Sequence, residues 1–302
     1  MEVVTLEKDG RCRWLEKRVL DKLIPQMVMA SVKKSEKTMC VIEDWISNDG
    51  GKVGVDVNWL HQLGIPVVQT YKDVPSDYVV VNTGYDSIVH EEKEIRDRGI
   101  EIIDEPCPYI RKIRKIFEDI DANYQYVLLC ERNHIIIKNY SSLFPKDMIL
   151  IQLNNYRELI HIRQNGKPLF LVPYVTFLDK HVDAVFNFIN MEYPERSNRS
   201  VRTGCMWISG PASPIVEIMN LSDDKLLGIR EALLITSPGS VNKSVISLIE
   251  TLEDKGLTVT PISGLKQYMD YEKTHGDSKV LLVRSPIPNN AEKPIMKYIN
   301  SG

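Results

Sequence analysis

Three cysteines, Cys12, Cys107 and Cys205, lie almost evenly along the chain, separated by 95 and 98 residues. Each follows a short stretch typical of a β-strand and precedes a segment typical of a helix. Because the start of a helix presents free N–H groups and a partial positive charge, it favours the thiolate form of a cysteine. Three such thiolates, one from each third of the chain, are candidate ligands of a single metal centre. The helices expected after them are Arg13–Ile24, Pro108–Ile120 and Trp207–Met219.

The other two cysteines fit a structural role. Cys40 lies in Thr38–Ile42 and Cys130 ends Tyr126–Cys130, and both segments are typical of buried strands, where cysteine behaves as a small apolar residue. Five widely spaced cysteines are unlike a secreted disulfide framework. Structural zinc is disfavoured, because no two cysteines stand two to four residues apart.

Composition narrows the class of protein. The chain has 302 residues, 43% hydrophobic and 26% charged, which is typical of a globular protein of two or three domains. A net charge of −3 gives no reason to expect a nucleic-acid or membrane partner. We find no apolar run long enough to span a membrane and no pattern of a signal peptide at the start, so we expect a cytoplasmic protein with a small-molecule substrate.

Short apolar runs alternate with amphipathic stretches, a pattern that predicts parallel α/β units. We expect three α/β domains related by pseudo-threefold symmetry around a central site, spanning residues 13–106, 107–204 and 205–302, with a strand from residues 1–12 joining the third. Ligands of such sheets gather at the carboxyl ends of the strands. The expected strands are Met1–Leu6, Pro66–Gln69, Tyr78–Asn82, Gly99–Ile103, Tyr126–Leu129, Met148–Gln152, Leu169–Val172, Ala232–Thr236, Leu257–Ile262 and Lys279–Val283.

Segments around two of the cysteines resemble motifs of the hydroxymethylbutenyl diphosphate reductase (LytB) family. The sequence Asp104-Glu-Pro-Cys107-Pro-Tyr-Ile-Arg-Lys is similar to the family's D-A-T-C-P-L-V-x-K element. Gly10-Arg-Cys12-Arg-Trp-Leu-Glu-Lys-Arg resembles its G-F-C-x-G-V-x-R-A opening. Leu234-Ile-Thr-Ser-Pro-Gly-Ser240-Val-Asn242-Lys-Ser is similar to its G-x-x-x-S-S-N-x-x-x-L turn. The likeness extends in order and spacing over the whole chain.

This resemblance implies a cofactor. Members of the family hold a [4Fe-4S] cluster through three cysteines, so it implies that Cys12, Cys107 and Cys205 are the ligands here. Thiolates are the usual ligands of iron–sulfur clusters. With three protein ligands, one iron stays open and is able to act as a Lewis acid or to pass electrons to a substrate.

The chain departs from the family's pattern where the family holds its diphosphate. The G-H-x-G-H-P-E element falls on Cys130–Ile136, where one histidine remains as His134 and the proton-relaying glutamate becomes Ile136. Among the phosphate-contacting residues, only Ser240 and Asn242 match. Because a buried diphosphate needs many hydrogen-bond donors, these changes favour a different substrate.

Aromatic and ionisable residues replace the missing donors. Tyr85, Tyr174 and Trp207 would suit a planar or apolar ligand, or would simply fill space. Near the same strand ends, Glu131 and His134 are candidate acid and base groups. Arg132 is a candidate clamp for a carboxylate, or the partner of Glu131 in solvent.

Three functional hypotheses follow. The first is an iron–sulfur-dependent lyase whose open iron acts on a small non-diphosphate substrate, an aromatic amino acid similar to tryptophan. The alternative is hydroxymethylbutenyl diphosphate reductase, an oxidoreductase of isoprenoid biosynthesis that would need ferredoxin or flavodoxin as electron donor. The third is a non-catalytic redox or iron sensor, although we find neither a basic helix nor a helix-turn-helix.

Overall fold

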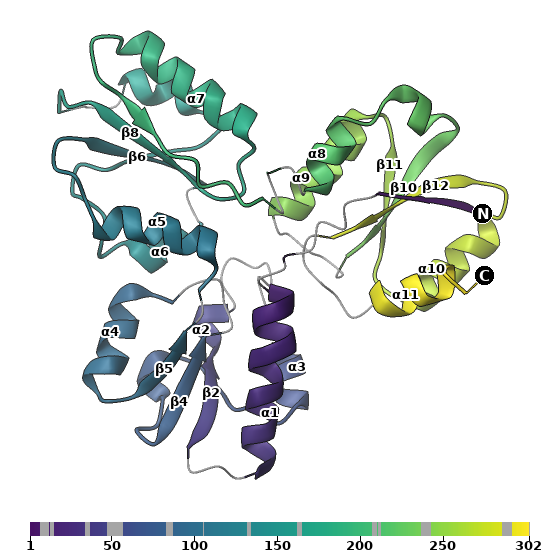
Figure 1. Cartoon of the computed structure of the whole chain (residues 1–302), viewed down its shortest axis with the longest axis horizontal. Coiled ribbons are helices and arrows are strands. Elements are labelled where there is room, and N and C mark those ends of the chain that lie inside the picture. Colours follow the sequence, from purple (N-terminus) through teal and green to yellow (C-terminus); the bar gives the residue numbers. More distant parts are fainter. Residues whose placement is uncertain are drawn as a thin grey trace. The chain divides into compact units, whose positions relative to one another are not determined.

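The structure is a computed structural model of the whole chain (Figure 1). It describes residues 1–6, 12, 15–33, 37–46, 57–82, 87–104, 106–131, 134–161, 165–206, 210, 213–236, 243–285 and 292–301. The chain divides into two compact units. Unit 1 consists of Met1–Lys17 with Met206–Gly302, and unit 2 consists of Arg18–Cys205.

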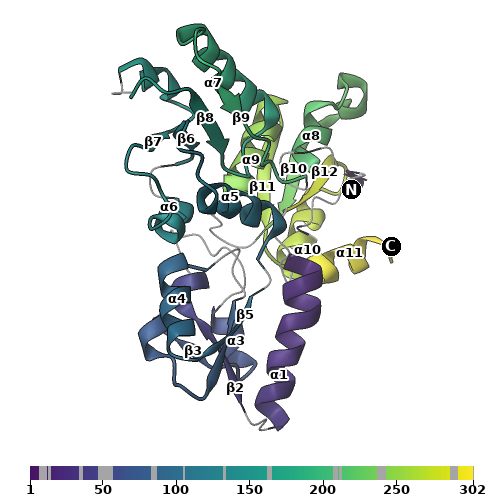
Figure 2. The ribbon, with the colours of Figure 1, turned by 60° about the vertical axis from the view of Figure 1, so that its left-hand side comes forward.

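Unit 2 contains two parallel sheets, and the first has the strand order β3-β2-β4-β5. Its core is formed by apolar side chains such as Cys40, Val80 and Ile102. In Figures 1 and 2, α1 and α4 lie on opposite sides of this sheet. The elements are α1 (Ile24–Lys33), β2 (Thr38–Ile42), α2 (Glu43–Ile46), α3 (Val57–Gln62), β3 (Val67–Val68), β4 (Tyr78–Asn82), α4 (Val89–Asp97) and β5 (Glu101–Asp104), with a 3-10 turn at Tyr71–Asp73.

The second sheet has the order β7-β6-β8-β9, and α7 covers one side of it while α5 and α6 lie on the other (Figure 1). Strand β6 is buried along its whole length, because both of its faces are covered. The elements are α5 (Pro108–Glu118), β6 (Gln125–Leu129), α6 (Ile135–Tyr140), β7 (Ile149–Ile151), β8 (Leu169–Pro173), α7 (Asp179–Glu192) and β9 (Arg199–Ser200), with a 3-10 helix at Tyr156–His161.

Unit 1 contains the third sheet, with the order β1-β12-β10-β11. The first strand of the chain pairs with the last, Glu2 opposite Lys279. Helices α8 and α9 lie on one side and α10 and α11 on the other (Figure 1). The elements are β1 (Glu2–Thr5), α8 (Pro214–Met219), β10 (Ile229–Ile235), α9 (Lys243–Asp254), β11 (Thr258–Ile262), α10 (Leu265–Thr274), β12 (Lys279–Arg284) and α11 (Glu292–Ile299), with a 3-10 turn at Asp223–Leu226.

The predicted α/β class is confirmed, since the three sheets formed by the described residues are parallel and each is flanked by helices. The division into domains 13–106, 107–204 and 205–302 stays a prediction. Among the described residues, no helix is both long and apolar enough to cross a membrane.

The helices expected after the three cysteines differ in how well they match. The helix after Cys107 is α5, which begins at Pro108 as predicted. The helix after Cys12 is described from Leu15, is π-helical to Leu23 and continues as α1 to Lys33. The helix predicted from Trp207 is wrong at its start, because α8 begins only at Pro214, where the Ser213 hydroxyl accepts the N–H of Ile215.

Candidate functional site at the strand ends of unit 2

Two neighbouring strands of the second sheet end side by side and present the candidate residues Glu131, His134 and Tyr174. In the parallel pairing of β6 with β8, Leu129 stands opposite Pro173. The next backbone N–H along, that of Tyr174, donates to the Leu129 carbonyl oxygen at 2.9 Å. The residues that follow both strands therefore emerge at one edge, where α/β sheets bind ligands.

His134 is held in a defined orientation at this edge. Its backbone N–H donates to the Glu131 carbonyl at 3.0 Å, and its ring caps α6, Nδ1 accepting the N–H of Ile136 at 3.2 Å. The ring also packs against Tyr174, with 3.9 Å between ring centroids and a 53° tilt. Because Nδ1 is the acceptor, the neutral imidazole is assigned its hydrogen on Nε2, which makes that nitrogen a donor.

Glu131 is oriented from a third strand. The Nε2 amide of Gln152, the residue after β7, donates to Glu131 Oε2 at 2.7 Å. Burial raises the pKa of the neighbouring Cys130 thiol to about 12, and the negative charge of Glu131 adds to this effect. Cys130 is therefore a neutral thiol in the core, as expected.

Cys205 is fixed to the same edge through its backbone. Its N–H donates to the carbonyl of Val175, the residue after Tyr174, at 2.9 Å. Two residues earlier, the Thr203 hydroxyl donates to the Pro173 carbonyl at the end of β8. The Cys205 side chain is 4% exposed. Cys205 is therefore hydrogen-bonded to the residue after Tyr174, whose ring packs on His134.

Cys107 is the residue from which α5 starts, and it is 5% exposed. Its carbonyl accepts the N–H of Arg111 at 2.8 Å, the first bond of the helix. From the next turn, Lys112 Nζ donates to the carbonyl of Arg202, three residues before Cys205. Within unit 2, α5 therefore connects the segments that carry two of the three candidate ligands.

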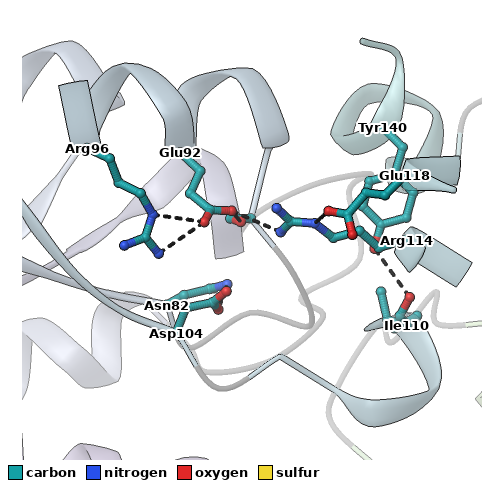
Figure 3. Close-up of polar contacts among 9 residues, drawn as sticks. Asn82, Glu92, Arg96, Asp104, Ile110, Arg114, Glu118 and Tyr140 are labelled. Atoms are coloured by element: carbon teal, nitrogen blue, oxygen red, sulfur yellow. Dashed lines mark hydrogen bonds and ion pairs between the residues drawn. The ribbon is translucent and has the colours of Figure 1, made fainter. Parts of the chain in front are cut away.

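A second polar pair precedes Cys107, at the end of the first sheet (Figure 3). Asn82 and Asp104 stand opposite one another at the ends of β4 and β5, and Asn82 Nδ2 donates to Asp104 Oδ1 at 2.9 Å. Burial raises the pKa of the Asp104 carboxyl, although the hydrogen bond from Asn82 opposes the rise. This pair was not among the site residues predicted from the sequence.

The remaining candidates are placed as follows. Cys12 is buried in unit 1, 5% exposed, whereas Cys107 and Cys205 belong to unit 2. No group of three or more His, Cys, Asp or Glu side chains suited to a metal ion occurs within the described ranges. Gln152 was not among the predicted site residues either, although its place at the end of the predicted strand Met148–Gln152 was an available signal. Five candidates lie outside the described residues: Tyr85, Arg132, Trp207, Ser240 and Asn242.

The sequence of the chain matches the model of a known protein family. The sequence model of the LytB family, described as "LytB protein", matches residues 25–220, about two thirds of the chain. The chain belongs to the LytB family. The predicted resemblance is thereby confirmed, and the matched region includes Cys107, Cys205 and the edge that carries His134.

Curated relatives of the chain are named as reductases. It is 20% identical over 151 residues to 4-hydroxy-3-methylbut-2-enyl diphosphate reductase of Anaplasma marginale (strain Florida), a match that covers 49% of this chain and 44% of that protein. This match thus spans less than half of the relative's length. The same enzyme of Wolbachia sp. subsp. Brugia malayi (strain TRS) is 18% identical over 313 residues, covering 97% of this chain and 98% of the relative.

Solved structures share the fold. The reductase from Plasmodium falciparum, titled E-1-hydroxy-2-methyl-but-2-enyl-4-diphosphate reductase, superposes with a TM-score of 0.72 at 14% identity, covering 99% of this chain and 87% of that one. A second structure, titled (E)-4-hydroxy-3-methyl-but-2-enyl diphosphate reductase, gives a TM-score of 0.61 at 15% identity, covering 100% and 99%. At these identities the likeness establishes the fold.

These comparisons correct the leading functional hypothesis. The prediction of a lyase acting on an aromatic amino acid is wrong, because the named relatives are 4-hydroxy-3-methylbut-2-enyl diphosphate reductases. The findings favour the alternative, the reductase. Of the three aromatic candidates, Tyr174 is among the described residues. Its ring packs against the protein's own His134 ring, so its presence does not require an aromatic ligand.

Proposed function

We propose that this chain is an iron–sulfur oxidoreductase that reduces 4-hydroxy-3-methylbut-2-enyl diphosphate. The observation that carries the proposal is the alignment with a reductase of this name over 97% of the chain, together with membership of the LytB family. The reaction removes the hydroxyl group of the substrate: the C–O bond breaks, two electrons and two protons are taken up, a C–H bond forms and water leaves. The electron donor belongs to the ferredoxin or flavodoxin class.

The residues present fit an iron–sulfur cofactor by their chemistry. Cys12, Cys107 and Cys205 are each buried, and none of the chain's cysteines forms a disulfide. Thiolates in a protected environment are the usual ligands of such clusters. We propose that these three cysteines hold a [4Fe-4S] cluster, which would supply the electrons for the reduction.

The chain's own residues then bind the substrate and move protons. His134 offers an N–H donor from Nε2, suited to a phosphate or hydroxyl oxygen. Ile136, which is 2% exposed, has no proton to donate, so we assign proton delivery at this edge to Glu131 or His134. Ser240 and Asn242 are the proposed contacts of the diphosphate, and Tyr85, Arg132, Tyr174 and Trp207 are proposed to line the substrate.

The test is anaerobic turnover. The protein is reconstituted with iron and sulfide, and oxidation of a reduced viologen dye is followed on addition of 4-hydroxy-3-methylbut-2-enyl diphosphate. We expect substrate-dependent oxidation that is abolished by Cys205→Ser and retained in Cys40→Ala. Full iron and sulfide content without any oxidation of the dye would contradict the proposal.

A further inference from the structure

Gln152 and Glu131 form a polar connection between two neighbouring strand ends. In the parallel pairing of β6 with β7, Leu129 stands opposite Ile151, so both residues leave the sheet at the same edge. Gln152 Nε2 donates to Glu131 Oε2 at 2.7 Å, a hydrogen bond between a neutral donor and a carboxylate. The backbone N–H of Gln152 in turn donates to Asn155 Oδ1 at 3.0 Å. The backbone of Gln152 is therefore fixed by its own hydrogen bond to Asn155 while the side-chain amide binds Glu131.

The Glu131 carboxylate, a hydrogen-bond acceptor, lies close in the chain to a hydrogen-bond donor, the His134 ring. Glu131 and His134 are joined by the 3.0 Å hydrogen bond from the His134 backbone N–H to the Glu131 carbonyl. His134 presents a donor at Nε2, because its Nδ1 accepts the N–H of Ile136. An ionised carboxylate only accepts hydrogen bonds. The edge therefore combines an acceptor at Glu131 with a donor at His134, and the backbone of Cys205 is bonded next to the Tyr174 that packs on His134.

We propose that Gln152 is a positioning residue that orients Glu131, and that the pair makes this edge select a ligand with a hydroxyl group at that point. A hydroxyl donates to the carboxylate, whereas a phosphate oxygen is repelled by it. The inference rests on the proposed function and deepens it. The hydroxyl end of 4-hydroxy-3-methylbut-2-enyl diphosphate faces Glu131, and the diphosphate end faces away from it.

The selectivity is measured by calorimetric titration of the reconstituted protein with two ligands. One is 4-hydroxy-3-methylbut-2-enyl diphosphate, and the other is the same molecule without the hydroxyl, 3-methylbut-2-enyl diphosphate. The quantity of interest is the ratio of their dissociation constants. We expect the wild type to prefer the hydroxylated ligand, and Gln152→Leu to lower this preference by about tenfold. Glu131→Gln should lower it as well, while Gln267→Leu, which removes an exposed glutamine in unit 1, should leave it unchanged.

A charge-exchange variant separates orientation of the carboxylate from general stability. Glu131→Gln combined with Gln152→Glu keeps one amide and one carboxylate in the pair, but moves the charge to the end of β7. We expect thermal stability close to that of the wild type, while the preference for the hydroxylated ligand stays lost. If the exchange restored the preference, the pair would be merely structural and the inference would be wrong.

Failure of the inference and failure of the proposed function give different results. Equal affinity of the wild type for both diphosphates, or an unchanged ratio in Gln152→Leu, overturns the inference alone. A protein that forms its cluster but binds neither diphosphate overturns the proposed function and the inference with it. Should Gln152→Leu fail to fold, Gln152→Asn, which keeps the amide but shortens its reach to Glu131, decides the same question.

Discussion

Removing the negative charge of Glu92 should destabilise unit 2 strongly. Glu92 lies on α4 beside the first sheet, and Figure 3 shows it between two arginines. Its carboxylate accepts hydrogen bonds from the Ser87 hydroxyl at 2.7 Å, from Arg96 Nε at 3.1 Å and from Arg114 at 2.9 Å. Arg114 belongs to α5, the helix that follows Cys107. The Glu92 side chain is 12% exposed and that of Arg114 17%, so this ion pair is largely withdrawn from water.

The magnitude follows from that burial. Breaking a buried ion pair by removing one partner costs about 3–5 kcal/mol, because the other charge is left without compensation. Arg114 keeps a second partner, Glu118, at 2.8 Å, so we expect the low end, about 3 kcal/mol, for Glu92→Gln. Glu118 is 46% exposed and bonds the same arginine, which makes Glu118→Gln the matched control. Its cost should be below about 1 kcal/mol.

The assay is urea unfolding, with the free energy of unfolding compared among the wild type, Glu92→Gln and Glu118→Gln. The pH dependence provides a second readout. Burial alone would raise the pKa of Glu92, but the hydrogen bonds from Ser87 and Arg114 and the charge of Arg114 hold it below its usual value. The stabilisation is therefore present above the unfolded-state pKa of about 4.3 and is lost as the pH falls through the lower folded pKa. Equal costs for the two variants, or the same acid sensitivity in wild type and Glu92→Gln, would refute this reasoning.

Three further predictions concern the cysteines and one glycine. Cys107→Ser should sharply lower the iron and sulfide content of the reconstituted protein, as measured by elemental analysis, whereas Cys40→Ala should leave it unchanged. A Cys107→Ser protein with full cluster content would exclude Cys107 as a ligand. Because burial raises the pKa of Cys130 to about 12, its thiol should resist iodoacetamide at pH 8 in the folded protein and react only after denaturation. Peptide mass spectrometry reports the modification, and a modified Cys130 in the folded protein would count against its burial. Gly256 has φ +76°, so Gly256→Ala should cost about 1–2 kcal/mol of unfolding free energy in urea, although the added methyl group meets no atom within 4 Å; an unchanged midpoint would argue against the backbone conformation.

Most of the strands could be predicted from the sequence because they are short apolar runs between turn residues, whereas β9 (Arg199–Ser200) has no apolar residue. The expected Tyr78–Asn82 and Thr38–Ile42 coincide with β4 and β2, and Leu169–Val172 differs from β8 by one residue. Burial on both faces explains this, since a continuous apolar run marks such a strand without any long-range information.

Helix starts were less predictable where local signals compete. The helix expected from Trp207 begins at Pro214, because Ser213 caps it and proline at the first helical position favours a start there. Between the predicted and the observed start lies Gly210, where the backbone passes close to Met206. A Cβ at position 210 would stand 2.6 Å from the Met206 Cα, so the position requires glycine. The Ser213-Pro214 pair was the available signal for this start.

The site was predictable only in part, because its residues meet through the fold. Glu131, His134 and Tyr174 were expected near one strand end, and the structure brings them together. The hydrogen bond from Gln152 joins residues 21 positions apart and depends on the register of β6 with β7, which no local pattern encodes. The substrate class was misjudged, because Tyr174 was attributed to an aromatic ligand although it packs on His134.

The most direct test of the central claim is the mass of the product formed from 4-hydroxy-3-methylbut-2-enyl diphosphate by the reconstituted protein with a chemical reductant under anaerobic conditions. We predict a methylbutenyl diphosphate that lacks one oxygen atom relative to the substrate, and no such product from Cys107→Ser. Recovery of unchanged substrate from a protein with its full iron and sulfide content would contradict the account.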